Sequence, residues 1–289
     1  MFQAEGRTGV EFVKLNNGVL MPQVSFGTYQ IPLHRTRRCV EEALACGYRG
    51  IDTAQNYGNE REVGEAIARS GIDRSEVFVT TKTQTSGYAR TAEGIDRSLR
   101  ELGCDYVDLL IIHWPSGDVC DTYRALEDAY RAGKARAIGV SNFYGDDLAR
   151  ILRECSVVPA VDQIECHPFW QQQVMRDVLS ERGIRLMDWS PLAEGSYGIF
   201  GNTTLTAIGD RHGKRAAQVA LRFLVQRGDI LAVKSMHRDR MLEDIDVFDF
   251  ELDADEVEAI EALDIGHGFT GWPSSGRIAE YTPSKAEQF

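Results

Sequence analysis

The sequence has no long hydrophobic run, and none of its apolar stretches approaches the roughly 20 residues that a membrane-spanning helix needs. Its first residues, Met-Phe-Gln-Ala-Glu, lack the basic and apolar regions of a secretory signal peptide. The hydrophobic content of 43% and the charged content of 26% are ordinary for a globular protein. We therefore expect a cytoplasmic protein without a membrane partner.

Paired cysteines are also lacking. The six cysteines are scattered, and they form neither a CxxC motif nor a Cys/His cluster with metal-ligand spacing. This pattern predicts free thiols in a reducing compartment and no metal site.

Basic residues are outnumbered, with 32 Lys and Arg against 44 Asp and Glu and a formal net charge of −12. Binding to nucleic acid or to an anionic membrane requires a basic surface, so the composition argues against both partners. An anionic small molecule remains a candidate ligand if basic residues gather at one site.

Apolar strand patterns alternate with helical patterns along most of the chain. Parallel neighbouring strands require crossover connections, so this alternation predicts an α/β protein with a parallel sheet. Predicted strands lie near residues 24–28, 48–52, 77–82, 107–113, 136–140, 160–164, 185–189 and 230–234. Predicted helices lie near residues 37–45, 60–69, 92–102, 122–132, 145–154, 174–182, 204–211 and 216–227.

Eight such units predict a (β/α)₈ TIM barrel, a fold that commonly takes ~250 residues, with an N-terminal β-hairpin over residues 10–21. A doubly wound open sheet is the alternative. It would predict a G-x-G-x-x-G motif at the first strand-to-helix turn, but the turn after Gly27 has none. No linker or low-complexity stretch interrupts the pattern, so we expect one domain over residues 1–289, with a loop and tail from about 266 to 289.

Four polar residues lie at or just after the ends of three consecutive predicted strands: Asp52, Tyr57, Lys82 and His113. In a parallel barrel, the C-terminal ends of the strands form the rim where active sites are built. Each residue alone has a structural explanation, such as an ion pair, a packed loop aromatic or a strand-end histidine. Together they favour a catalytic site.

This combination suits the protonation of a carbonyl oxygen. A free tyrosine has a pKa of ~10, and the Lys82 ammonium, held by Asp52, is expected to lower the pKa of Tyr57 and make it a better acid. His113 would orient the carbonyl by a hydrogen bond. The hydride must come from a cofactor, because side chains do not supply one.

Several motifs in chain order resemble the aldo-keto reductase superfamily, over about residues 15–264. The resemblance rests on residues 52–60, 110–115, 138–143, 163–168 and 234–235. The run 242–252 and the short C-terminus are similar to the bacterial 2,5-diketo-D-gluconate reductase-like members. The resemblance implies an NADPH-dependent carbonyl reductase, a monomer, with Tyr57 as acid supported by Asp52, Lys82 and His113.

It also implies a set of cofactor residues. Ser141, Asn142 and Gln163 match the positions that hold the nicotinamide carboxamide, and Trp189 matches the aromatic that stacks on the nicotinamide. The other matching positions are Gly27, Thr28 and Asp52 at the rim, Ser190, Leu192, Glu194 and Gly195 over the pyrophosphate, Lys234, Ser235 and Arg240 at the 2′-phosphate, and Glu243 and Asp244 at the adenine. Electrostatics also favours a phosphate at this position. Lys234 precedes a helix predicted to start near Arg238, and the N-terminus of a helix attracts anions.

Tyr29, Asn56, His113, Trp114 and Trp272 match or suit the walls of a substrate pocket, and their aromatic character favours small carbonyl compounds. Two alternatives remain open. One is a barrel aldolase in which Lys82 forms a Schiff base, which Asp52 disfavours because that lysine requires desolvation. The other is a regulatory barrel protein that binds NADPH, similar to the potassium-channel β subunits.

Overall fold

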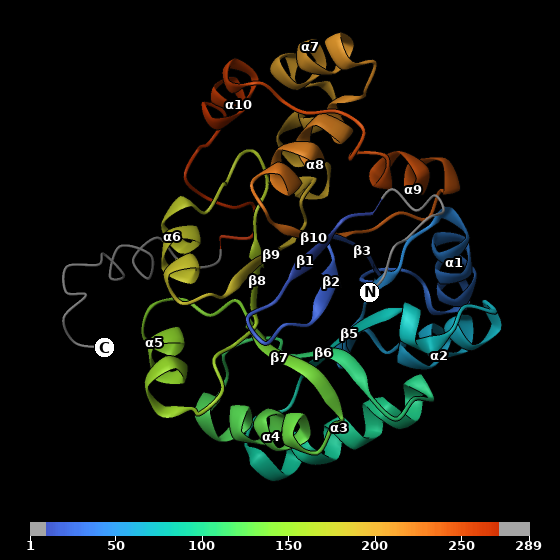
Figure 1. Cartoon of the computed structure of the whole chain (residues 1–289), viewed down its shortest axis with the longest axis vertical. Helices are drawn as coiled ribbons and strands as arrows, with labels where there is room; N and C mark the ends of the chain where they lie inside the picture. The colour runs from blue at the N-terminus through green and yellow to red at the C-terminus, as the bar shows by residue number, and fades with distance from the viewer. Residues whose placement is uncertain (1–9, 272–289) are drawn as a thin grey trace.

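A computed structural model describes residues 10–271 and contains the predicted barrel. Eight parallel strands close on themselves in the order β10-β3-β4-β5-β6-β7-β8-β9, and the helices surround this ring (Figure 1). The strands are β3 (Val24–Gly27), β4 (Gly50–Asp52), β5 (Phe78–Thr83), β6 (Val107–Ile112), β7 (Ala135–Ser141), β8 (Val161–Glu165), β9 (Arg185–Trp189) and β10 (Ile230–Val233).

The crossover helices pack their apolar faces on the outside of the ring. They are α1 (Leu33–Cys46), α2 (Glu60–Arg69), α3 (Tyr88–Leu102), α4 (Val119–Arg131), α5 (Gly145–Glu154), α6 (Gln173–Glu181) and α8 (Ala216–Gln226). Helices α7 (Thr203–His212), α9 (Arg238–Ile245) and α10 (Ala254–Glu261) are additional, as are the 3₁₀ segments η1 (Gln55–Tyr57), η2 (Arg74–Glu76) and η3 (Ala193–Gly201). None of the helices within residues 10–271 has the length and hydropathy that crossing a bilayer requires.

The predicted hairpin consists of β1 (Phe12–Lys14) and β2 (Leu20–Pro22), which pair antiparallel. It crosses the near end of the barrel in Figure 1 and adds Leu15 and Met21 to the apolar cluster inside the ring. That cluster includes Phe78, Leu109 and Met187, so the barrel interior is a packed core. The closed end leaves the opposite rim, where the strands end, for polar side chains.

Some predicted boundaries are wrong by a few residues. Helix α3 begins at Tyr88 rather than near residue 92, because its first turn is exposed and shows no apolar periodicity. Strand β6 ends at Ile112, so His113 follows it directly, and β8 continues two residues beyond Gln163. These differences leave the rim in its predicted place.

Candidate active site

Lys82 is the centre of the polar network at the rim. Its ammonium nitrogen lies 2.5 Å from Oδ1 of Asp52, 2.9 Å from the carbonyl oxygen of Thr53 and 3.3 Å from the hydroxyl of Tyr57. The side chains of Lys82 and Asp52 are buried, whereas Tyr57 is partly exposed. An ion pair buried at a strand end therefore holds a cation against the phenol, as expected from the sequence.

The predicted lowering of the Tyr57 pKa is wrong for this structure. Burial and, next, the negative charge of Asp52 raise the pKa of Tyr57 well above its ordinary value. Burial also lowers the pKa of Lys82, although Asp52 opposes that shift. The Lys82 ammonium alone would lower this pKa, but desolvation of the phenol is the larger effect here. Tyr57 consequently keeps its proton at neutral pH.

His113 faces Tyr57 across the rim, with ring centroids 5.6 Å apart in an edge-to-face arrangement. Burial and the charge of Lys82 lower the pKa of His113 to about 3. The imidazole is therefore neutral near pH 7. Its Nδ1 atom has no hydrogen-bond partner among the described residues.

A second polar group lies on the neighbouring strand ends β7, β8 and β9. Asn142 donates from Nδ2 to the carbonyl oxygen of His113 over 3.1 Å and accepts a 2.9 Å hydrogen bond from Nε1 of Trp189. Ser141 donates to the carbonyl oxygen of Gln163 over 2.7 Å. Gln163 Nε2 in turn donates to Oδ2 of Asp52 over 3.1 Å, which joins this group to the Lys82 network.

Aromatic side chains surround the opening of the site. Tyr29 is 51% exposed with its ring centroid 5.0 Å from that of Tyr57, and Trp114 is 41% exposed and stacks on His113 at 6.3 Å. Asn56, which precedes Tyr57 in the chain, is also exposed. The structure thus brings Tyr29 and His113 to Tyr57, and Trp114 to His113, while Trp272 lies outside the described residues.

Comparison with known proteins identifies the family. The model of the aldo/keto reductase family matches residues 23–265. An aldo-keto reductase from Mycolicibacterium smegmatis is 43% identical over 259 residues, covering 88% of this chain and 94% of that protein. The glyoxal reductase of Bacillus subtilis is 42% identical over 255 residues, covering 87% of this chain and 92% of that enzyme.

A solved structure agrees with these relatives. The crystal structure of a Bombyx mori aldo-keto reductase in complex with NADP has a TM-score of 0.86 and 32% identity, and covers 94% of this chain and 99% of that one. This chain belongs to the aldo-keto reductase family.

In this aldo-keto reductase, an irregular loop follows β9 on the rim side. Ser190, Ala193, Glu194 and Tyr197 have positive φ angles without being glycine. Ser190 donates to Oε1 of Glu194 over 3.4 Å, while Leu192 is half-buried and Gly195 is exposed. The predicted loop residues therefore lie together on one tightly wound segment.

The basic end of this aldo-keto reductase site lies after β10. Lys234 and Arg240 are exposed; Lys234 lies four residues before α9, and Arg240 lies within the first turn of that helix. Ser235 accepts a 3.1 Å hydrogen bond from the backbone of His237 and so fixes the turn that leads into the helix. A helix N-terminus beside two cations suits a phosphate group.

At the predicted adenine position, Glu243 forms an ion pair with Arg215 at 3.3 Å, and Asp244 is buried. Burial and the charge of Glu243 raise the pKa of Asp244 to about 7. The Asp244 carboxyl therefore carries a proton on a substantial fraction of molecules at neutral pH and can then donate a hydrogen bond.

Gly27 and Thr28, also predicted as cofactor residues, close the strand end next to Asp52. Thr28 is buried, and its backbone N–H and its hydroxyl both donate to the carbonyl oxygen of Asp52, over 2.9 and 3.1 Å. Asn59, which the sequence reasoning missed as a supporting residue, donates to the carbonyl oxygen of Thr28 over 3.1 Å. Asn59 thus ties the first strand end to the Asp52 loop.

The segment after α10 was also missed. Glu165 accepts hydrogen bonds from the backbone of Phe269 over 2.8 Å and from the hydroxyl of Thr270 over 2.5 Å. These contacts hold the Phe269 ring 6.2 Å from the Trp189 ring, edge to face. The Gly/Ser-rich composition of this stretch indicates a loop but gives no sign of that attachment.

Proposed function

We propose that this protein reduces aldehydes and ketones to alcohols with NADPH, and that Tyr57 donates the proton. The observation that carries the proposal is the 3.3 Å contact between the Lys82 ammonium and the Tyr57 hydroxyl, at a rim position that also holds His113. Tyr57 stays protonated until it gives its proton to the carbonyl oxygen. The nearby ammonium then stabilises the phenolate that this transfer leaves behind.

His113 contributes as a neutral imidazole. Because burial keeps its pKa at about 3, one ring nitrogen donates a hydrogen bond and the other accepts one. A donated hydrogen bond to the carbonyl oxygen would orient it toward Tyr57. Asp52 acts through Lys82, by keeping the ammonium in place.

The residues present fit a nicotinamide cofactor. Ser141, Asn142 and Gln163 offer donors and acceptors for a carboxamide, and Trp189 offers an aromatic face. Residues 190–195 would lie over the pyrophosphate, and Lys234, Ser235 and Arg240 would hold the 2′-phosphate. When bound, NADPH supplies the hydride that no side chain can provide.

The exposed aromatic side chains of Tyr29 and Trp114 at the opening of the site favour small substrates, namely an aldehyde, a ketoaldehyde or a keto-sugar acid. The similarity to a glyoxal reductase supports a small carbonyl compound. The special closeness to 2,5-diketo-D-gluconate reductase-like members remains a prediction, as do the single domain, the monomeric state and the cytoplasmic location.

The Schiff-base alternative fits the structure poorly. Lys82 is 1% exposed and its amine already contacts Asp52, Thr53 and Tyr57, so a substrate carbon has no free approach. Borohydride treatment in the presence of substrate should accordingly leave Lys82 unmodified. Covalent trapping of substrate carbon on that residue would favour the aldolase.

A substrate panel tests the proposed function. Glyoxal, methylglyoxal, a simple ketone and a keto-sugar acid are each mixed with the protein and NADPH, and the loss of NADPH absorbance is followed beside NADH controls. We expect turnover of at least one small carbonyl with NADPH preferred. A protein that binds NADPH tightly but reduces no member of the panel would instead support the regulatory alternative.

A further inference from the structure

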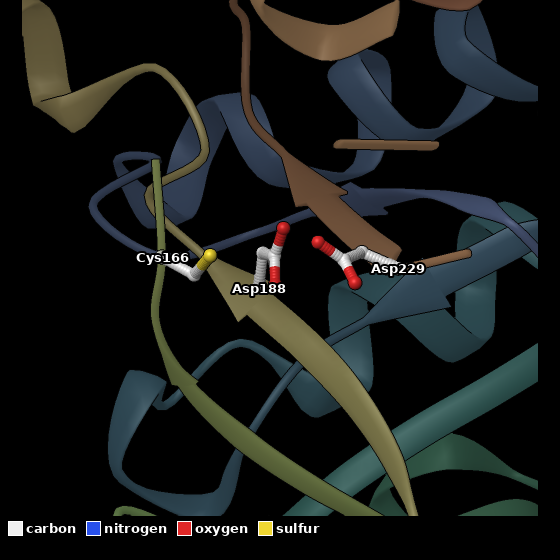
Figure 2. A group of neighbouring side chains, drawn as sticks. All are labelled: Cys166, Asp188 and Asp229. Carbon is white, nitrogen blue, oxygen red and sulfur yellow. The ribbon is translucent and has the colours of Figure 1, made fainter. Parts of the chain in front are cut away.

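Three buried side chains meet outside the barrel wall, away from the rim network. Cys166 follows β8 directly, Asp188 lies on β9 and Asp229 immediately precedes β10. They are 0%, 0% and 1% exposed, and one ligand atom of each lies within 4.8 Å of the other two. Figure 2 shows the thiol and the two carboxylates pointing toward one another.

The strand register explains this meeting. Asp188 pairs with Leu231 of β10 and with Ile164 of β8, so side chains two residues away on each neighbouring strand share its face. Asp229 and Cys166 occupy those two positions. Met187 lies in the barrel interior, so Asp188 points outward, toward the helices.

The buried Asp188 carboxylate lacks strong hydrogen-bond donors. The side chain is fully buried, and among the described residues its carboxylate has no hydrogen-bond partner other than the Cys166 thiol, a weak donor within the same cluster. A buried carboxylate with no stronger partner is unfavourable, and natural proteins satisfy such groups with a cation, a proton or donors. This side chain is the independent sign that something else belongs in the cluster.

The charges nearby match one divalent cation. Arg176 of α6 binds both carboxylate oxygens of Asp229, one at 2.7 Å, and so balances that charge. Arg227 instead donates to Gln171 over 3.0 Å and to Gln173 over 2.8 Å. Burial raises the pKa of both Cys166 and Asp188, so a cation that binds here must displace protons, and the two groups then bring two negative charges to it.

We propose that Cys166, Asp188 and Asp229 form a buried site for a divalent thiophilic cation, with Zn²⁺ as the best match. A thiolate with two carboxylates suits zinc better than the all-oxygen preference of Ca²⁺ or Mg²⁺. Zinc bonds of about 2.0 Å to oxygen and 2.3 Å to sulfur place tetrahedral ligand atoms roughly 3.5 Å apart. The ligand atoms now lie within 4.8 Å of one another, so shifts of about 1 Å would bring them to that spacing.

A route to the site exists at the hairpin end of the barrel. Asp229 and Arg176 both line a cavity of about 420 Å³ that also reaches Lys14 and Asn16. Movement of the Arg176 side chain would open Asp229 to that cavity. The three side chains lie on the helix-facing side of the barrel wall, not in its interior. Because they join three adjacent strands, we assign the site a structural role.

Metal titration of the full chain, prepared without an affinity tag and freed of metal with a chelator, tests the site. We expect about one equivalent of Zn²⁺ to bind and to raise the Tm. With Co²⁺ as the probe, a thiolate-to-metal charge-transfer band should appear. Cys166→Ser should remove that band, and Asp188→Asn should weaken binding by at least about tenfold.

Cys155→Ser is the matched control, because Cys155 is a free cysteine that does not belong to the cluster. This variant should keep the band and the stoichiometry. A band that survives Cys166→Ser overturns the proposal, and so does absence of the band in the wild-type protein, which requires no variant to fold. A proton would then satisfy Asp188, whose pKa burial and Asp229 raise well above its ordinary value.

Discussion

Gln163 donates a hydrogen bond from Nε2 to Oδ2 of Asp52 over 3.1 Å, although the two residues lie 111 positions apart. Asp52 uses its other oxygen to bind Lys82. One carboxylate therefore joins the predicted nicotinamide-binding amides to the predicted acid. Positioning of the cofactor and the proton donor is thus coupled through a single buried side chain.

Replacing Tyr57 by phenylalanine should reduce kcat for carbonyl reduction by ~10²–10⁴-fold, because the proton donor is lost while the ring remains. NADPH affinity should change only a few-fold, as measured by titration. Tyr88→Phe is the matched control, since Tyr88 is an exposed tyrosine at the start of α3 and belongs to none of the proposed sites. A Tyr57→Phe enzyme with more than half of the wild-type turnover would exclude Tyr57 as the acid.

Replacing Lys234 and Arg240 by neutral residues should weaken the binding of NADPH far more than the binding of NADH, because only NADPH carries the 2′-phosphate. Hydrogen bonds to charged groups contribute roughly 1.5–3 kcal/mol each, or about 10- to 150-fold in affinity per contact. Isothermal titration with both cofactors measures the difference. Arg100→Gln, a charge change on the exposed last turn of α3, should affect neither. Equal losses for the two cofactors would contradict the assignment.

The His113 imidazole should make stability depend on pH in acid. Its folded pKa of about 3 lies below the ordinary 6.5, so the unfolded chain binds the proton more tightly between these values. Its contribution to stability is full above pH 6.5 and is lost as the pH falls toward 3. His113→Gln should reduce the slope of the unfolding free energy against pH in this window by up to about 1.4 kcal/mol per pH unit. Denaturant titrations at several pH values measure this slope, and the exposed His34→Gln should leave it unchanged.

Adding a methyl group at Gly268 should detach the segment that carries Phe269. A Cβ there would collide with the Glu165 carboxylate and the Trp170 ring. We expect Gly268→Ala to cost roughly 1–3 kcal/mol in the free energy of unfolding and to speed hydrogen exchange around residue 269. Gly201→Ala, where nothing lies within 4 Å of the added atom, serves as the control. Unchanged exchange in Gly268→Ala would show that the added methyl group does not detach the segment.

NADPH affinity should fall as the pH rises through about 7 if Asp244 donates to the adenine, because the carboxyl loses its proton in that range. Asp244→Asn should remove this dependence and bind more tightly above pH 7, since an amide donates at any pH. Binding titrations at pH 6 and pH 8 compare the two proteins. Parallel pH profiles would mean that Asp244 does not contact the base.

The barrel and its rim could be predicted from the sequence because both depend on local patterns. Strands buried on both faces are almost continuously apolar, so their ends can be located from the sequence. Asp52, Lys82 and His113 lie at those ends. The pKa of Tyr57 could not be predicted in this way. It depends on how deeply the folded chain buries the phenol, which no local pattern encodes.

The meeting of Cys166, Asp188 and Asp229 was equally hidden. They come from three strands, and their sequence separations match no metal-ligand spacing, so the sequence analysis predicted no metal site. Only the parallel register brings them onto one face. The attachment of Phe269 to Glu165 depends on the path of the last segment, which composition alone does not determine.

Among the described residues, seven that are not glycine have positive φ angles, and four of them lie between Ser190 and Tyr197. Such conformations cost of order 1 kcal/mol or more each, so this loop is held by the rest of the barrel at the expense of overall stability. Laboratory selection for thermostability should therefore favour glycine at positions such as Glu194 or Tyr197, which removes the backbone strain. Since the same segment is proposed to cover the pyrophosphate, such thermostable variants should have lower turnover.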